Sequence, residues 1–129
     1  MKKILTLMLV LTAFCAHAHF QVLMPNTDAA TQQNINIKFD MFFTHPFEQG
    51  PMMEMVKPKA VDLYLNGKKE NLMGGIKQVK RSGKSAWEFS YQMKKPGDHI
   101  FVVTPDYYFE PAESVFIQHI TKTVVNGFG

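Results

Sequence analysis

NINIKFDMF, residues 34–42, alternates polar and apolar side chains with a period of two. Successive side chains of a β-strand point to opposite faces, so this pattern predicts a strand with one buried face. The buried face would carry Ile35, Ile37, Phe39 and Met41. We therefore expect the domain to be built around a half-buried β-strand.

Further runs of the same kind follow, separated by turn-forming residues. Residues 61–65 repeat the alternation and stop at Asn66-Gly67, a dipeptide typical of tight hairpin turns. The runs 85–93 and 99–104 are joined by Pro96-Gly97-Asp98, which predicts a second hairpin.

The last predicted strand covers residues 115–125, in which Val115, Ile117 and His119 share one face. His99, at the start of the preceding run, is expected to be exposed to solvent. No segment after residue 18 has a sustained helical period. The expected fold is therefore all-β, a small antiparallel sandwich of the immunoglobulin-like type that follows a signal peptide.

The first 18 residues predict a cleaved export signal. Lys2 and Lys3 give it a positive start, an apolar stretch follows, and Ala16-His17-Ala18 is the small-x-small pattern that precedes cleavage. We expect a signal peptide at 1–18, followed by one exported β-sandwich domain at 19–129. No transmembrane segment is expected in the mature chain, because no later stretch approaches the length of a bilayer span.

Charge and cysteine content narrow the possible partners and chemistry. Cleavage removes two lysines and no acids, which leaves 12 Lys and Arg against 11 Asp and Glu. Such a balance argues against nucleic acid as a partner. Cys15 is the single cysteine and lies within the signal, so the mature chain would have neither a disulfide nor a thiolate ligand. A lipoprotein cleavage that leaves Cys15 lipidated is the alternative, but the bulky Phe14 fits it poorly.

Cleavage after Ala18 would make His19 the first residue of the mature protein. An N-terminal histidine can chelate a metal ion through its α-amine and its ring Nδ1, which close a six-membered ring. An internal histidine has no free amine and cannot do this. His19 is therefore a candidate metal ligand, and the alternative is an exposed and frayed terminus.

Residues 43–55 bring several further donor groups together. They contain the imidazole of His45, the carboxylate of Glu48 and the thioethers of Met52, Met53 and Met55. Nitrogen and carboxylate donors suit nickel, cobalt, copper or zinc, whereas thioethers favour reduced copper. The alternative is that the methionines fill gaps in the core and that His45 is a turn residue bonded to the backbone.

Three later residues could add ligands, and each has a structural alternative. His119 would reach a metal only at a sheet end and would otherwise be a core or edge residue. Glu110 and Glu113 could bind the metal, orient an imidazole, or belong to a solvated loop. Common hydrolase, phosphate-binding and HExxH motifs are absent from the sequence, so an enzyme is not expected.

The whole mature chain resembles one family of exported domains of unknown function. The resemblance is carried by HFQVLMP (19–25), FTHPFE (43–48), PMMEM (51–55), YFEPAE (108–113) and IQH (117–119). This family has been linked to nickel/cobalt uptake and was earlier labelled as the NikM transporter subunit. The resemblance implies a periplasmic protein that binds nickel or cobalt and supports uptake by an inner-membrane importer. Members usually continue into a second β-domain, so residues 19–129 are expected to be the N-terminal part of a longer architecture or a one-domain variant.

The predicted metal ligands are His19, His45 and either Glu48 or His119 as the last donor. The expected ion is divalent nickel or cobalt, with copper as the alternative. Three other functions stay open. These are a periplasmic copper carrier similar to CopC, a copper monooxygenase that uses an N-terminal histidine, and an accessory domain that binds no metal.

Overall fold

The computed structural model describes residues 20–45, 49–111 and 113–129, which form β-strands, one short 3-10 helix and the loops between them. In chain order the elements are β1 (Phe20–Pro25), β2 (Ala29–Ala30), β3 (Asn36–Thr44), β4 (Ala60–Leu65), β5 (Lys68–Asn71), η2 (Met73–Gly75), β6 (Lys77–Arg81), β7 (Lys84–Gln92), β8 (Gly97–Thr104), β9 (Tyr108–Glu110), β10 (Val115–Ile117) and β11 (Thr121–Gly127). Within those ranges no helix has the length and apolar character needed to cross a membrane.

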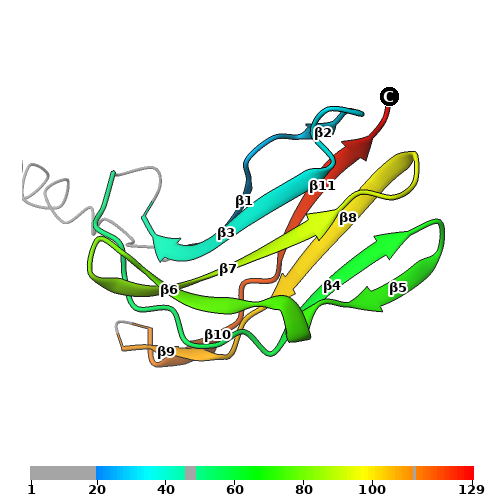
Figure 1. The fold of residues 1–129 in the computed structure, drawn as a ribbon. Helices are drawn as coiled ribbons and strands as arrows, with labels where there is room; N and C mark the ends of the chain where they lie inside the picture. The colour runs from blue at the N-terminus through cyan, green and yellow to red at the C-terminus, as the bar shows by residue number, and fades with distance from the viewer. Residues whose placement is uncertain (1–19, 46–48, 112) are drawn as a thin grey trace, which may run out of the picture.

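Two sheets face each other and enclose the core (Figure 1). One sheet has the strand order β1-β3-β7-β6 and is antiparallel throughout. The other has the order β2-β11-β8-β4-β5, and in it β2 runs parallel to β11. The short hairpin β9–β10 forms a separate two-stranded sheet at one end of the sandwich. The predicted all-β sandwich is confirmed.

The alternating stretch at 34–42 forms most of β3, whose inward side chains lie at the centre of the core. Ile37, Phe39 and Met41 are at most 1% exposed. The Phe39 ring stacks on Phe89 with centroids 4.5 Å apart and meets Phe101 of the opposite sheet at 4.3 Å. The period of two therefore identified the buried face correctly for these three residues, whereas Ile35 is half-buried and lies just before the first residue of β3.

One predicted hairpin is confirmed and the other is wrong. Asn66 and Gly67 have positive φ angles of 49° and 73°, as a tight turn between β4 and β5 requires. Residues 93–97, by contrast, carry the chain from one sheet to the other, because β7 pairs with β3 and β6 whereas β8 pairs with β4 and β11. Met93, at this crossing, is 2% exposed and belongs to the core. The strands β7 and β8 therefore lie in facing sheets, with their apolar sides turned toward each other.

The single strand predicted at 115–125 is also wrong. The chain forms β10 against β9, leaves that hairpin, and then enters the larger sheet as β11 against β8. The side-chain amide of Gln118 donates to the carbonyl oxygen of Pro105 at 2.9 Å and holds the break between the two strands. His119 therefore lies in a connecting segment and not in the middle of a strand.

A close backbone approach at Gly127 leads to the first stability prediction. A Cβ atom added at Gly127 would lie 2.6 Å from the carbonyl oxygen of Lys95 and 3.2 Å from Cε1 of His99. We expect Gly127→Ala to lower the free energy of unfolding by about 1 to 3 kcal/mol, as overpacking of a tight interior does. Urea denaturation measures this. Gly74→Ala is the matched control, because its Cβ would meet nothing within 4 Å, and equal losses in both variants would contradict the prediction.

Candidate functional site

The start of β1, the end of β3 and the segment before β11 meet at one end of the sandwich. Phe20 lies opposite Thr44 in the β1–β3 register, so His45 comes directly after the residue that faces Phe20. The Phe20 ring also stacks on the ring of His119, with centroids 5.7 Å apart and planes 23° from parallel. We call this region the N-terminal corner and define it by Phe20, Gln21, Thr44, His45, His119 and Thr121.

Hydrogen bonds fix the start of β1 against the start of β11 on the other sheet. The Gln21 amide donates to Thr121 Oγ1 at 2.9 Å and to the carbonyl oxygen of Val103 at 3.3 Å. Thr121 Oγ1 in turn donates to the main-chain oxygen of Gln21 at 3.1 Å. Gln21 is 6% exposed, so this pair is a buried polar link between the two sheets. The link holds β1 in place at the point where the described part of the chain begins.

His119 lies between two aromatic rings and has a buried ring nitrogen. The His119 ring stacks on Phe20 and also forms a T-shaped contact with the Tyr108 ring, with centroids 6.0 Å apart and an interplanar angle of 77°. Its Nδ1 atom is buried and has no hydrogen-bond partner among the described residues. A buried polar atom without a partner is unfavourable and needs an explanation. In the tautomer that is protonated at Nε2, Nδ1 has a lone pair that a cation can bind.

Hydrogen bonds join the end of β3 and His45 to the chain at Gly50. The Gly50 amide donates to the carbonyl oxygen of His45 at 3.0 Å, and Thr44 Oγ1 donates to the carbonyl oxygen of Gly50 at 3.1 Å. A Cβ atom at Gly50 would lie 2.7 Å from Cβ and 3.3 Å from Cγ of His45. Only glycine fits here, and it lets the His45 side chain lie close against the returning chain.

The three methionines of this segment have different environments. Met55 is 3% exposed and belongs to the core, and its carbonyl oxygen accepts a hydrogen bond from Trp87 Nε1 at 3.1 Å. Met53 is half-buried and its amide donates to the carbonyl oxygen of Phe43 at 2.9 Å. Met52 is also half-buried. The gap-filling interpretation therefore holds for Met55, which is packed in the core.

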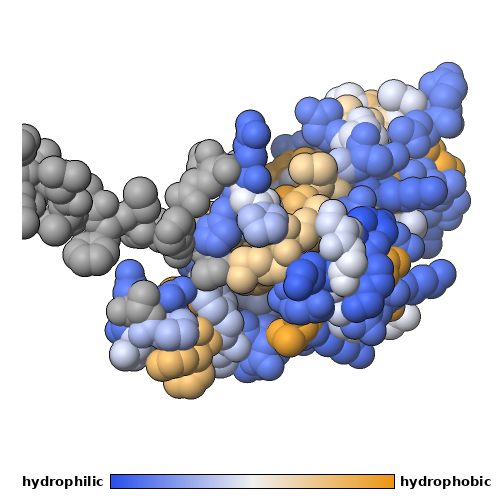
Figure 2. Space-filling view, turned by 90° about the vertical axis from the view of Figure 1, so that its left-hand side faces the viewer, coloured by the Kyte–Doolittle hydropathy of each residue, from blue (hydrophilic) through white to orange (hydrophobic). Residues whose placement is uncertain are grey.

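A cavity of about 350 Å³ adjoins the N-terminal corner, because the ring of Tyr108, which lines the cavity beside Phe43, also contacts His119. Its wall is mainly apolar, and Glu54, Asp106 and Glu110 add carboxylates to the lining. Figure 2 looks on to this end of the sandwich and shows apolar residues near the centre with hydrophilic residues around them.

Two carboxylates, those of Glu110 and Glu113, place negative charge near Tyr108. Burial raises the pKa of the Tyr108 hydroxyl, and the negative charges of Glu110 and Glu113 raise this pKa further. The phenol therefore stays protonated at neutral pH and is not an anionic ligand. The same two carboxylates give the surroundings of the Tyr108 and His119 rings a potential that favours a cation.

Two of the four predicted ligands lie among the described residues and two do not. His19 and Glu48 lie outside the described residues. His45 and His119 are both described, and Phe20 connects them, because it pairs with the residue before His45 and stacks on His119. In the ranges 20–45, 49–111 and 113–129, no group of three or more His, Cys, Asp or Glu side chains could hold a metal ion.

Sequence reasoning missed the polar link and the aromatic neighbours of His119. Gln21 was the available signal, because a polar residue stands there on the face that also carries the buried Leu23. Nothing in the spacing of Phe20, Tyr108 and His119 predicts that their rings meet, since residues 20 and 119 belong to opposite ends of the domain sequence.

A second stability prediction tests the link between β1 and β11. Thr121→Val keeps the shape of the side chain but removes both hydrogen bonds to Gln21, so we expect a loss of about 1 to 3 kcal/mol in the free energy of unfolding. Thr123→Val, two residues along the same strand, makes the same chemical change at a side chain that forms no hydrogen bond with the described part of the protein. Chemical denaturation of both variants should separate them. Indistinguishable values would show that the link contributes nothing.

Fold and site together define a β-sandwich in which Phe20 stacks on His119 and pairs with the residue before His45. The chain belongs to the family described as a domain of unknown function, DUF4198, whose sequence pattern matches residues 16–129. Comparison with curated proteins and with solved structures finds no match.

Proposed function

We propose that this protein is an exported carrier that binds a divalent transition metal ion, nickel or cobalt, at the N-terminal corner and supports its uptake by an inner-membrane importer. In this proposal the metal is cargo, and the protein acts in the periplasm without catalysing a reaction. His19 chelates the ion through its amine and imidazole, and His45 and His119 supply further nitrogens. Glu48 is a candidate for an oxygen ligand from the same loop.

The observation that carries the proposal is the position of Phe20. It pairs with Thr44 in the register and stacks on His119, so the two described histidines lie beside the second residue of the expected mature chain. His19 is bonded to Phe20, and consecutive Cα atoms are about 3.8 Å apart. A chelating first residue would therefore begin one Cα step from Phe20, the residue that connects His45 and His119.

Two further observations support a cation at this corner. The buried Nδ1 of His119 lacks a hydrogen-bond partner among the described residues, and a metal ion would satisfy its lone pair. Burial is the main cause of the raised pKa of Tyr108, and the charges of Glu110 and Glu113 add to it, so negative charge lies near the ring that contacts His119. Both effects favour a cation bound near His119.

The copper-carrier alternative is weakened by the position of Met55. A site for reduced copper built from Met52, Met53 and Met55 needs all three thioethers at the surface, and Met55 is 3% exposed and packed in the core. Divalent copper at the nitrogen ligands would be compatible with the same corner. The metal competition below distinguishes these ions.

The test is native mass spectrometry of the signal-cleaved protein offered nickel, cobalt, copper and zinc together. We expect one bound ion, nickel or cobalt, on a chain that begins at His19. His119→Phe keeps a ring between Phe20 and Tyr108 but removes both nitrogens, so it should weaken binding by roughly tenfold or more, or about 1.4 kcal/mol at least. Ile120→Ala is the control, because Ile120 is 62% exposed and carries no donor. Equal metal occupancy of the two variants would remove His119 from the site.

Metal binding is also expected to depend on pH. An α-amine and imidazoles must be unprotonated to bind, and their ordinary pKa values are about 8 and about 6.5. Affinity should therefore fall as the pH is lowered from about 8 to about 6, and protons should be released on binding at the lower end of that range. Calorimetry in buffers of different ionisation enthalpy measures this release. An affinity that stays constant across the range would contradict a site of nitrogen ligands.

A further inference from the structure

A second cavity opens at the end of the sandwich opposite the N-terminal corner, where the β4–β5 hairpin lies beside the crossing from β7 to β8 (Figure 1). Its volume is about 490 Å³, within the range of small-molecule sites in proteins. The side chains of Leu63, Leu65, Tyr91 and His99 form its apolar and aromatic wall. None of the residues proposed to bind metal contributes to it.

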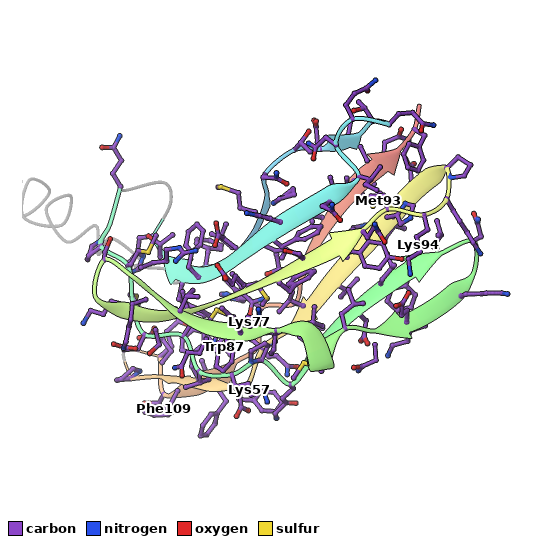
Figure 3. All side chains as sticks on the ribbon, viewed as in Figure 1. Lys57, Lys77, Trp87, Met93, Lys94 and Phe109 are labelled. Carbon is purple, nitrogen blue, oxygen red and sulfur yellow. The ribbon has the colours of Figure 1, made fainter. Side chains whose placement is uncertain are left out.

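Four lysines and one glutamate line this cavity. Lys69 forms an ion pair with Asp62 at 3.1 Å. Glu70 accepts a hydrogen bond from the Tyr91 hydroxyl at 3.5 Å. The remaining three lysines are exposed and form no ion pair within the described part of the chain; they are Lys68, Lys94 and Lys95. Figure 3 shows Lys94 at this end of the molecule, far from Phe109 at the other. The mouth of the cavity therefore has an excess of positive charge.

His99 adds a buried and unsatisfied acceptor to the wall. It was expected to be exposed from the sequence, but it is 0% exposed, because its ring packs against Tyr91 with centroids 5.9 Å apart. Its Nδ1 lies 3.0 Å from the carbonyl oxygen of Gly97, which can only accept, so in the neutral ring Nδ1 carries the proton and Nε2 is the acceptor. Nε2 is buried and has no partner among the described residues. A buried acceptor of this kind favours an occupant that supplies a hydrogen-bond donor.

We propose that this cavity binds a small organic anion that has an apolar, ring-sized body, a carboxylate or phosphate group, and a hydroxyl group. The anionic group lies among Lys68, Lys94 and Lys95. The body packs on the Tyr91 ring and Leu65, and the hydroxyl donates to His99 Nε2 after a small adjustment of the wall. This site is independent of the proposed metal site, so either can fail without the other.

The experiment uses three matched probes and follows the backbone amides of the mature protein by NMR. The probes are 3-(4-hydroxyphenyl)propionate, 3-phenylpropionate, which lacks the hydroxyl, and 3-(4-hydroxyphenyl)propanamide, which lacks the charge. We expect saturable shifts at Leu65, Tyr91, Lys94 and His99 with the hydroxy acid, and weaker binding of both other probes. The ¹⁵N resonance of His99 Nε2 should move with the hydroxy acid and not with 3-phenylpropionate.

Lysine variants test the charge without touching the core. Lys68→Gln, Lys94→Gln and Lys95→Gln combined should weaken binding of the hydroxy acid by roughly tenfold at low salt, because three charges near the anion are lost. The control combines Lys57→Gln, Lys77→Gln and Lys84→Gln, which line neither this cavity nor its mouth, and should bind as the unaltered protein does.

Three results would overturn the proposal. The first is the absence of saturable shifts with the hydroxy acid at millimolar concentration, and the second is equal binding of the acid and its amide. The third is binding to anionic phospholipid vesicles without binding of the free acid, because the lysines would then serve a membrane surface. Equal binding of the two acids would remove the hydroxyl and His99 from the site.

Discussion

One extra residue in front of His19 is expected to weaken metal binding by on the order of 100-fold, which corresponds to about 2.7 kcal/mol of binding free energy. The extension converts the α-amine into an amide nitrogen, which is a poor donor, and so breaks the chelate ring while leaving every side chain in place. Isothermal titration of the signal-cleaved protein and of a form that carries one added glycine measures the difference.

The matched control places the same glycine after Gly129, which is exposed and far from the corner in sequence. It should bind metal as the unextended protein does. If the extension at the N-terminus is equally harmless, the amine of His19 is not a ligand, and a site that relies on His45 and His119 alone would have to be considered.

Phe39→Ala is expected to cost about 3 to 5 kcal/mol in the free energy of unfolding, as truncation of a large buried ring does. Phe39 is 1% exposed and touches a ring of each sheet, Phe89 at 4.5 Å and Phe101 at 4.3 Å between centroids. Removing it leaves a cavity at the centre of the contact between the sheets. Urea denaturation followed by Trp87 fluorescence measures the loss.

Phe116→Ala is the control for this change, because Phe116 is 72% exposed. Its truncation should alter the free energy of unfolding by about 0.5 kcal/mol or less. A similar loss in both variants would mean that the contact among Phe39, Phe89 and Phe101 is not the centre of the core. The β9–β10 hairpin, which carries Phe116, would then contribute as much as the sandwich itself.

The fold class and the buried face of β3 could be predicted because both depend on local alternation. Ile37, Phe39 and Met41 are buried as the period of two requires. The pairing of strands depends instead on which apolar faces meet across the molecule. The Pro96-Gly97-Asp98 segment fits a hairpin equally well, and only the burial of Met93 at the crossing shows why the chain changes sheets there.

The surroundings of His119 in the candidate site could not be predicted from local sequence patterns either. The sequence identifies histidines and carboxylates as possible ligands, but it places His119 in the middle of a strand. The break at Gln118, which depends on a hydrogen bond to Pro105 thirteen positions earlier, brings His119 next to Phe20. Contacts between residues so distant in the chain leave no periodic trace in the sequence. His99 was predicted to be exposed, but it is buried, because its ring packs against Tyr91 of the facing sheet.

The central claim is that His19, His45 and His119 bind one metal ion at the N-terminal corner. Anomalous diffraction at the nickel edge, from crystals of the signal-cleaved protein grown with nickel, tests this most directly. The account predicts one peak about 2 Å from the amine and ring nitrogen of His19 and from a ring nitrogen of both other histidines. A peak elsewhere on the molecule, or His45 and His119 directed to different sides of Phe20 with no metal between them, would contradict it.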